Sequence, residues 1–224
     1  MKFLEYTPFT RINGFLSNLD LGDCRLKGVL EAYSCKLAGT DKKLSRSIEQ
    51  EVLDSLEMSP QNLSSSPVGP LSSLSSRRTL IHLILTLSHM YPDYDFSTLR
   101  AHHFSKENPL GVKESIGYHL LEATRVWASE LGNSSLLIDA IWEVIDEVID
   151  IKDCDIYSFS PEFQVGPFND GGMIWSFNYF FYNKKLKRVL YFSCQSVSKL
   201  AADESLDNEA DTDEDDFIQG MEIE

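Results

Sequence analysis

The sequence predicts one α/β domain, a sandwich in which helices cover both faces of a mixed or antiparallel central sheet. Three observations predict this fold. Segments with helical spacing of apolar residues alternate irregularly with segments of strand character along residues 1–200. The last two strand segments are joined by a short turn, which only an antiparallel pair allows. Both of these segments carry large apolar side chains on both faces, as expected for a sheet that is covered on its two sides.

The first part of the chain contains a helix, a strand, a second helix and an insertion. Residues 8–19 have apolar side chains on one helical face and proline in the first turn, so a short helix is expected. Residues 24–36 alternate between two faces, as a strand does. Residues 41–57 place apolar side chains four apart, which predicts a helix with a charged outer face. Residues 59–76 hold eight serines and three prolines, so a disordered insertion within the domain is expected.

The middle of the chain is mainly helical. Residues 80–87 are apolar nearly all round, which favours a buried helix and leaves a central strand as the alternative. Residues 93–97 are expected to form a turn or a short edge strand. Residues 112–130 carry a helical apolar stripe that predicts one helix. Residues 134–150 form the clearest amphipathic helix, with an apolar stripe opposite an acidic one.

The last part of the folded region is expected to be mostly strand. Residues 155–159 predict a strand, and residues 160–172 a loop rich in glycine and proline. A hairpin follows, with strands over residues 175–181 and 186–194 and a turn at residues 183–185.

The charge of the chain is concentrated at its C-terminal end. The 224 residues carry a net charge of −15, and residues 201–224 hold eleven carboxylates and no lysine or arginine. Residues 1–200 are therefore nearly balanced, with 24 acidic and 20 basic side chains. A disordered acidic tail is expected, which either solvates the chain or binds a basic protein. No direct sequence-specific contact with nucleic acid is expected, because nothing neutralises a run of phosphates.

Signatures of the common enzyme classes are missing from the sequence. It contains no glycine-rich dinucleotide loop, Walker-type phosphate loop, nucleophile elbow or zinc-protease motif. The four cysteines are widely spaced and are expected to be reduced thiols. We therefore expect no enzymatic activity, no catalytic residue, no metal and no cofactor. An enzyme of unknown type, with the loop at residues 160–172 as its pocket rim, is the rival class. No secretory signal or membrane-length apolar stretch is recognised, so no membrane contact is expected.

Four hydroxyl groups are candidate phosphorylation sites. Ser45 follows lysines at positions −3 and −2, which a basophilic kinase reads, and is expected to point outward at a helix start. Ser59 and Ser66 each precede proline in the predicted insertion, where proline-directed kinases have access. Thr212 directly precedes a run of acidic residues and suits an acidophilic kinase. A solvated helix face and a plain linker are the alternatives.

Two charged clusters are candidates for partner binding. The first is basic, lies at the hairpin turn, and either forms a nuclear-import patch or guards a strand edge. Its members are Lys184, Lys185, Lys187 and Arg188. The second is the acidic stripe of the helix at residues 134–150, either a solvated face or a docking surface for a basic partner. Its members are Asp139, Glu143, Asp146, Glu147 and Asp150.

Blocks of this sequence resemble the Maf-type repressors of RNA polymerase III transcription. Similarity extends over residues 1–37, 77–106 and 154–197, in the family's order. The block at residues 92–97 reads PDYDFS. The most specific block, residues 175–188, reads WSFNYFFYNKKLKR and follows a DIYS segment. An insertion and an acidic tail also fall where this family has them.

The resemblance implies a eukaryotic negative regulator without enzymatic activity. It implies binding to RNA polymerase III, which hinders recruitment of the polymerase with transcription factor IIIB to tRNA and 5S rRNA genes under nutrient limitation or stress. It also implies inactivation by protein kinases, reactivation by phosphatases, and shuttling between the nucleus and the cytoplasm. The insertion and tail are shorter than in longer members, so family phosphosites in those parts are not transferred by position. The alternative is an acidic-tailed adaptor that binds basic proteins without polymerase specificity.

Overall fold

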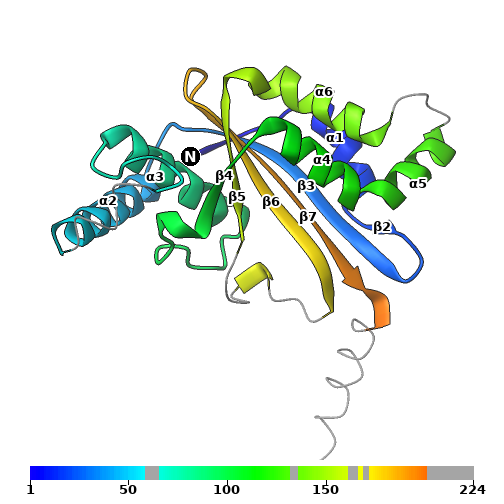
Figure 1. The fold of residues 1–224 in the computed structure, drawn as a ribbon, viewed down its shortest axis with the longest axis horizontal. Coiled ribbons are helices and arrows are strands. Elements are labelled where there is room, and N and C mark those ends of the chain that lie inside the picture. The colour runs from blue at the N-terminus through cyan, green and yellow to red at the C-terminus, as the bar shows by residue number, and fades with distance from the viewer. Residues whose placement is uncertain (59–65, 132–135, 161–165, 169–171, 201–224) are drawn as a thin grey trace, which may run out of the picture.

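The structure, a computed structural model, describes residues 1–58, 66–131, 136–160, 166–168 and 172–200. In these ranges the chain forms one seven-stranded sheet with six α-helices packed around it (Figure 1). The strand order is β1-β3-β7-β6-β5-β4, with the short β2 also paired to β3, and all pairs are antiparallel. The predicted single α/β sandwich is confirmed.

The strands are β1 (Lys2–Leu4), β2 (Leu19–Asp20), β3 (Cys24–Ser34), β4 (Phe104–Glu107), β5 (Cys154–Phe159), β6 (Met173–Asn183) and β7 (Arg188–Ser198). The α-helices are α1 (Thr7–Leu16), α2 (Thr40–Met58), α3 (Leu74–Met90), α4 (Pro109–His119), α5 (Leu121–Leu131) and α6 (Leu137–Ile149). Three short 3-10 helices complete the described elements, namely η2 (Ala101–His103), η3 (Ile151–Asp153) and η4 (Gly166–Phe168).

Both faces of the sheet are buried, as the apolar residues of β6 and β7 predict. Phe181 of β6 and Phe192 of β7 face the first core, which is closed by α1, α4, α5 and α6. Phe180 and Tyr191, next to them in sequence, face the second core under α2 and α3. Alternation along a strand sends neighbouring side chains to opposite faces, so two helical layers are needed to cover them.

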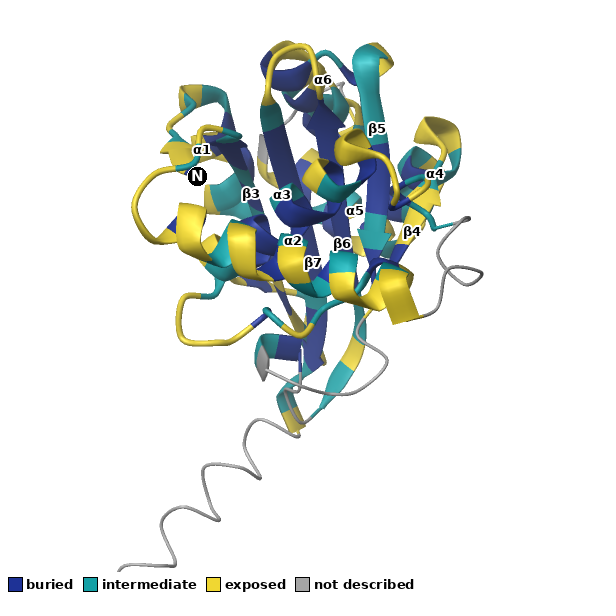
Figure 2. Cartoon of the chain, turned by 90° about the vertical axis from the view of Figure 1, so that its left-hand side faces the viewer, coloured by how far each residue is buried: buried dark blue, intermediate teal, exposed yellow. Residues whose placement is uncertain are grey.

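The second helical layer consists of two helices that lie at different depths. Helix α3 lies against the sheet, and nine of its side chains are buried. Helix α2 packs on α3 and buries only Asp41, Ile48 and Val52. Figure 2 shows the same difference, because α2 exposes its outer surface while the strands behind it are dark. Helix α2 is therefore the less deeply anchored of the two.

Two predicted helices have different bounds in the structure. The helix expected at residues 8–19 ends at Leu16, because residues 19 and 20 pair with β3 instead. The single helix expected at residues 112–130 is two helices, α4 and α5, which are separated at Leu120. The buried stripe crosses this break without interruption, since Ile116, Leu120 and Ala123 are all fully buried. Periodicity alone therefore predicts a continuous helix there.

The insertion predicted at residues 59–76 is only partly outside the ordered structure. Residues 59–65 lie outside the described residues, and disorder there stays a prediction. Over residues 66–76 the prediction is wrong, because Val68 and Leu71 are buried in the second core and α3 begins at Leu74. The Ser73 side chain caps α3 by accepting a hydrogen bond from the Ser75 amide. The serine at position 73 therefore marks the start of a helix rather than a disordered segment.

The segment at residues 93–97 is a turn, one of the two alternatives that the sequence allows. Asp95 accepts hydrogen bonds from the backbone N–H and the hydroxyl of Ser97. The strand next to β5 at one edge of the sheet is β4, which the sequence does not predict.

Candidate functional site

The acidic stripe of α6 faces solvent, but three of its five carboxylates have local partners. Asp139 pairs with Lys113 at 2.9 Å. Asp146 accepts a hydrogen bond of 2.8 Å from the Ile151 amide, which fixes the turn after the helix. Asp150 pairs with Lys152 at 3.5 Å and ends the helix in a left-handed conformation. These three side chains therefore have structural roles that the sequence pattern does not reveal.

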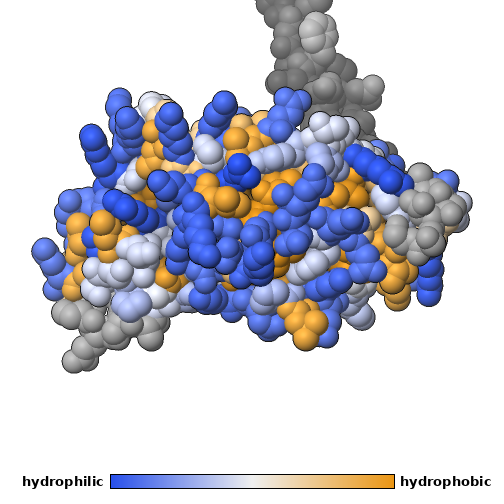
Figure 3. Space-filling view, turned by 90° about the horizontal axis from the view of Figure 1, so that it is seen from above, coloured by the Kyte–Doolittle hydropathy of each residue, from blue (hydrophilic) through white to orange (hydrophobic). Residues whose placement is uncertain are grey.

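Glu143 and Glu147 are the two uncommitted carboxylates of the stripe. Both are exposed, lie one helical turn apart, and make no ion pair within the described part of the chain. Figure 3 views the molecule from above, the side on which α4 and α6 lie in Figure 1. The surface there is mostly hydrophilic, with hydrophobic side chains visible between the polar ones. These two glutamates are thus the part of the predicted acidic face that remains available to a partner.

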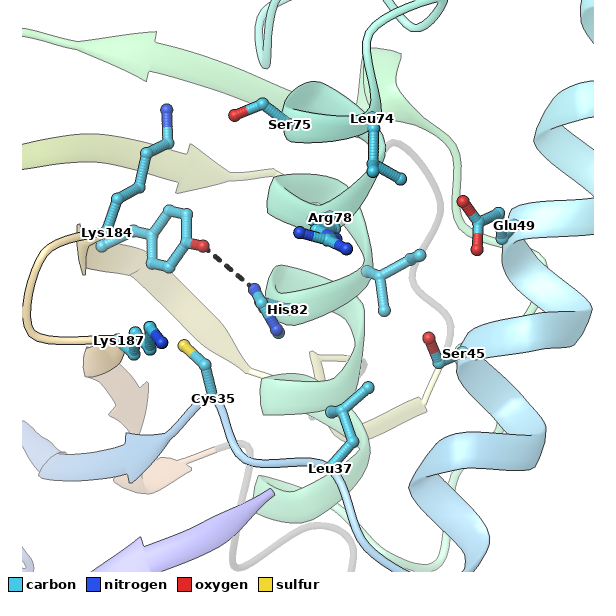
Figure 4. Close-up of a pocket in the computed structure, with 12 residues that line it drawn as sticks. Cys35, Leu37, Ser45, Glu49, Leu74, Ser75, Arg78, His82, Lys184 and Lys187 are labelled. Atoms are coloured by element: carbon cyan, nitrogen blue, oxygen red, sulfur yellow. Dashed lines mark hydrogen bonds between the residues drawn. The ribbon is translucent and has the colours of Figure 1, made fainter.

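A cavity of about 740 Å³ lies between α2, α3 and the β6–β7 turn (Figure 4). The residues around it are Cys35, Leu37, Ser45, Glu49, Leu74, Ser75, Arg78, Ile81, His82, Tyr182, Lys184 and Lys187. Ser45 is half-buried and lies at the wall formed by α2. The expectation that Ser45 points outward from the molecule is therefore wrong, because the face of α2 beside Ile48 packs toward α3.

Two of the groups that line this cavity are neutral, His82 and Cys35. His82 Nδ1 lies 3.1 Å from the hydroxyl of Tyr182. Burial, followed by the positive charge of Arg78, lowers the pKa of His82 to about 4. Burial also raises the pKa of the Cys35 thiol to about 12. At neutral pH the histidine and the thiol are therefore both uncharged.

The basic cluster at the β6–β7 turn is exposed and partly paired. Lys184 pairs with Asp155 at 2.8 Å, and Lys185 pairs with Asp153 at 2.9 Å. Exposed ion pairs of this kind are worth only about 0–1 kcal/mol, so both lysines stay accessible to a receptor.

The other two basic residues of the cluster hold the backbone of the turn. Arg188 is half-buried and donates a hydrogen bond of 3.1 Å to the carbonyl of Val148, near the C-terminal end of α6. Lys187 has a positive φ of 53°, and its carbonyl accepts a hydrogen bond from the Cys35 amide at 2.9 Å. The Lys187 side chain lines the cavity.

Ser66, the other predicted phosphorylation site within the described residues, does not line this cavity. The half-buried Ser66 donates its hydroxyl hydrogen bond to the carbonyl of Gly69, in the turn that precedes α3. Ser59 and Thr212 lie outside the described residues. The structure instead places Ser45 on one side of the cavity and Lys184 and Lys187 on the other (Figure 4), and no local pattern in the sequence predicts this arrangement.

The rival class, an enzyme of unknown type, predicts a cavity that contains carboxylates with shifted pKa values. The described cavities include the large one and a smaller one of about 300 Å³ beside Pro167. Hydrogen bonds or ion pairs lower the pKa of Asp20, Asp95 and Asp155, and all three lie outside these cavities. Within those ranges, no group of three metal-ligand side chains is found, and no helix has the length and apolarity to span a bilayer.

The chain is similar to known proteins in sequence and in structure. The model of the Maf1 regulator family matches residues 26–193. A protein of Schizosaccharomyces pombe named repressor of RNA polymerase III transcription maf1 is 37% identical over 208 residues, which cover 89% of this chain and 84% of that protein. The Dictyostelium discoideum repressor of RNA polymerase III transcription is 34% identical over 247 residues, covering 89% of this chain and 86% of that one. A crystal structure of citrus MAF1 superposes with a TM-score of 0.73 at 45% identity, covering 86% of this chain and 100% of that chain.

Proposed function

This chain belongs to the Maf1 regulator family, and from that membership we propose that it is a negative regulator of RNA polymerase III transcription. It binds the polymerase and hinders its recruitment with transcription factor IIIB at tRNA and 5S rRNA genes, under nutrient limitation or stress. It works by occupying a surface, without catalysis or a cofactor. The similarity to named repressors over 89% of the chain carries this proposal.

The available carboxylates of α6 suggest how the domain docks. Glu143 and Glu147 are exposed and unpaired within the described residues, so their charges can meet a basic surface of the polymerase. Complementary charge across an interface mainly raises the association rate and excludes wrong partners. Asp139, Asp146 and Asp150 contribute to the same negative field while holding α6 and the turn that follows it.

Charge reversal at the two free glutamates tests this docking surface. The double variant Glu143→Lys, Glu147→Lys should bind purified RNA polymerase III at least about tenfold more weakly at near-physiological salt, because attraction becomes repulsion. A matched control is Glu57→Lys, Glu130→Lys, which reverses two exposed glutamates on α2 and α5. Both variants should keep the wild-type unfolding midpoint. Equal affinity of the two variants for the polymerase would show that α6 is not part of the interface.

Regulation by phosphorylation is proposed at Ser45, with Ser59, Ser66 and Thr212 as further candidates. Ser45 lies within α2 and is half-buried, whereas a kinase groove takes its substrate in an extended form. The first turns of α2 must therefore open before a kinase reaches this hydroxyl. A phosphate there adds about two negative charges, and phosphatases reverse the change.

Transport between cytoplasm and nucleus is proposed to depend on the turn that contains Lys184, Lys185 and Lys187. All three side chains are exposed, which an import receptor requires. Phosphorylated protein is expected in the cytoplasm, and dephosphorylated protein in the nucleus, where repression takes place.

A further inference from the structure

The cavity beside Ser45 contains a surplus of positive charge. Arg78, Lys184 and Lys187 reach it from two separate parts of the fold (Figure 4). Its one carboxylate, Glu49, accepts a hydrogen bond of 3.4 Å from the Nε of Arg77, which is not among the lining residues. Arg78 and Lys187 have no ion-pair partner in the described part of the chain. Two uncompensated cations therefore remain beside a space that is large enough for a ligand.

The backbone at Lys187 supports a role for its side chain. The left-handed region costs a residue with a Cβ roughly 1–2 kcal/mol, so glycine or asparagine is usual there. Lys187 adopts this conformation despite its cost, and its side chain places a cation at the cavity. Strained backbone positions of this kind are frequent where a protein holds a ligand.

The other walls of the cavity are apolar or weakly polar. Leu37, Leu74 and Ile81 supply hydrocarbon surface, and the hydroxyls of Ser45 and Ser75 can donate hydrogen bonds. The neutral thiol of Cys35 leaves the surplus positive charge uncancelled. A volume of about 740 Å³ exceeds what one inorganic anion needs and lies in the range of about 300–1,000 Å³ that is usual for small-molecule sites.

We propose that this cavity binds a small phosphate monoester, with its phosphate held by Arg78 and Lys187 and its organic part packed on Leu37, Leu74 and Ile81. A phosphate monoester is close to doubly charged at neutral pH, because its second pKa is about 6, and so matches two free cations. The planar guanidinium of Arg78 presents a fork of donors that fits phosphate oxygens. This binding is separate from the proposed docking on the polymerase, since α6 does not line the cavity.

The full-length, unphosphorylated protein can be titrated with phenyl phosphate and followed by the NMR shifts of backbone amides. Saturable shifts are expected at Cys35, His82 and Lys187. Arg78→Ala and Lys187→Ala should each weaken binding about tenfold, the effect of one lost charge-assisted hydrogen bond. Lys185→Ala is the matched control, because Lys185 lies in the same turn but does not line the cavity. It should leave the affinity unchanged.

Further probes separate this ligand from general anion attraction. Phenyl sulfate, with one negative charge, and inorganic phosphate, with no organic part, should both bind more weakly than phenyl phosphate. Ser45→Asp adds a carboxylate to the cavity and should weaken binding, whereas Ser47→Asp, on the exposed side of α2, should not. Shifts that do not saturate, or equal affinities of wild type, Arg78→Ala and Lys187→Ala, would overturn the proposal. Inorganic phosphate binding as tightly as phenyl phosphate would overturn the assignment of an organic ester.

Discussion

The buried amide of Asn183 is a single side chain that joins two elements of the fold. Its Nδ2 donates a hydrogen bond of 2.8 Å to the carbonyl of Ile149 at the end of α6, and its Oδ1 accepts one of 2.9 Å from the Leu186 amide. Asn183→Ala should lower the free energy of unfolding by about 2–3 kcal/mol, because the buried Ile149 carbonyl and the partly buried Leu186 amide both lose their partner. Urea denaturation measures this effect. The exposed neighbour Lys185→Ala should change it by less than about 1 kcal/mol, and similar losses in both variants would contradict the prediction.

His82 is expected to make the fold sensitive to acid. Its pKa is about 4 in the folded protein and about 6.5 in an unfolded chain, so the unfolded state binds more protons between these values. The free energy of unfolding should therefore fall as the pH drops through this window, by about 2 kcal/mol between pH 7 and pH 5 from this residue alone.

Comparison with His82→Gln isolates this contribution. The glutamine cannot titrate in this range, yet it retains polar groups for the Tyr182 hydroxyl. Urea denaturation at several pH values should show the stability of the wild type falling more steeply than that of the variant. Identical pH dependence in the two proteins would show that the pKa of His82 is the same in the folded and unfolded states.

The acidic stripe shows what single-residue patterns in a sequence can and cannot predict. Helical periodicity places Glu143 and Glu147 on the solvent side correctly, because it depends only on the geometry of one helix. It cannot assign Asp139 to Lys113 of α4, or Asp146 to the turn after the helix, because these partners are fixed by tertiary contacts. The predicted five-residue face therefore contains two free carboxylates.

Among the elements, α2 should be the helix of its layer that opens most easily. Three of its nineteen residues are buried, against nine of seventeen in α3. Local opening follows the extent of buried contact, so native-state hydrogen exchange should be at least about tenfold faster in α2 than in α3. Amide exchange followed by NMR checks this. Equal protection of both helices would mean that they open together, and Ser45 would then be reached by a kinase only on global unfolding.

Element boundaries depart from the predictions where local and tertiary signals differ. The strands β3, β6 and β7 are long and have strong alternation, and all three overlap the predicted segments, with ends that differ by up to four residues. The edge strand β4 has only four residues, and its pairing with β5 cannot be seen in its own sequence. Serine and proline at residues 66–73 suggest disorder, but Val68 and Leu71 reach the second core and hold the segment.

At the scale of the whole molecule, the sheet order brings distant segments to one cavity. Residues 35 and 187 are neighbours because β3 pairs with β7, and α2 follows β3 directly in the chain. The local sequence contains no signal for this pairing, so the placement of Ser45 and two hairpin lysines around one cavity was not predictable. The fold class was predictable, because it depends on the number and type of elements rather than on their contacts.

The charge distribution of the whole chain leads to a prediction about its acidic tail. Residues 1–200 include both cores and the free glutamates of α6, so a chain that ends at residue 200 should keep its affinity for purified RNA polymerase III within about threefold at near-physiological salt. The Debye length there is about 8 Å, which screens most of the long-range attraction from a tail that is not in contact. Binding of the full chain with no binding of the shortened one would move recognition into residues 201–224 and favour the adaptor that binds basic proteins. If neither chain bound, repression would need a bridging factor between this protein and the polymerase.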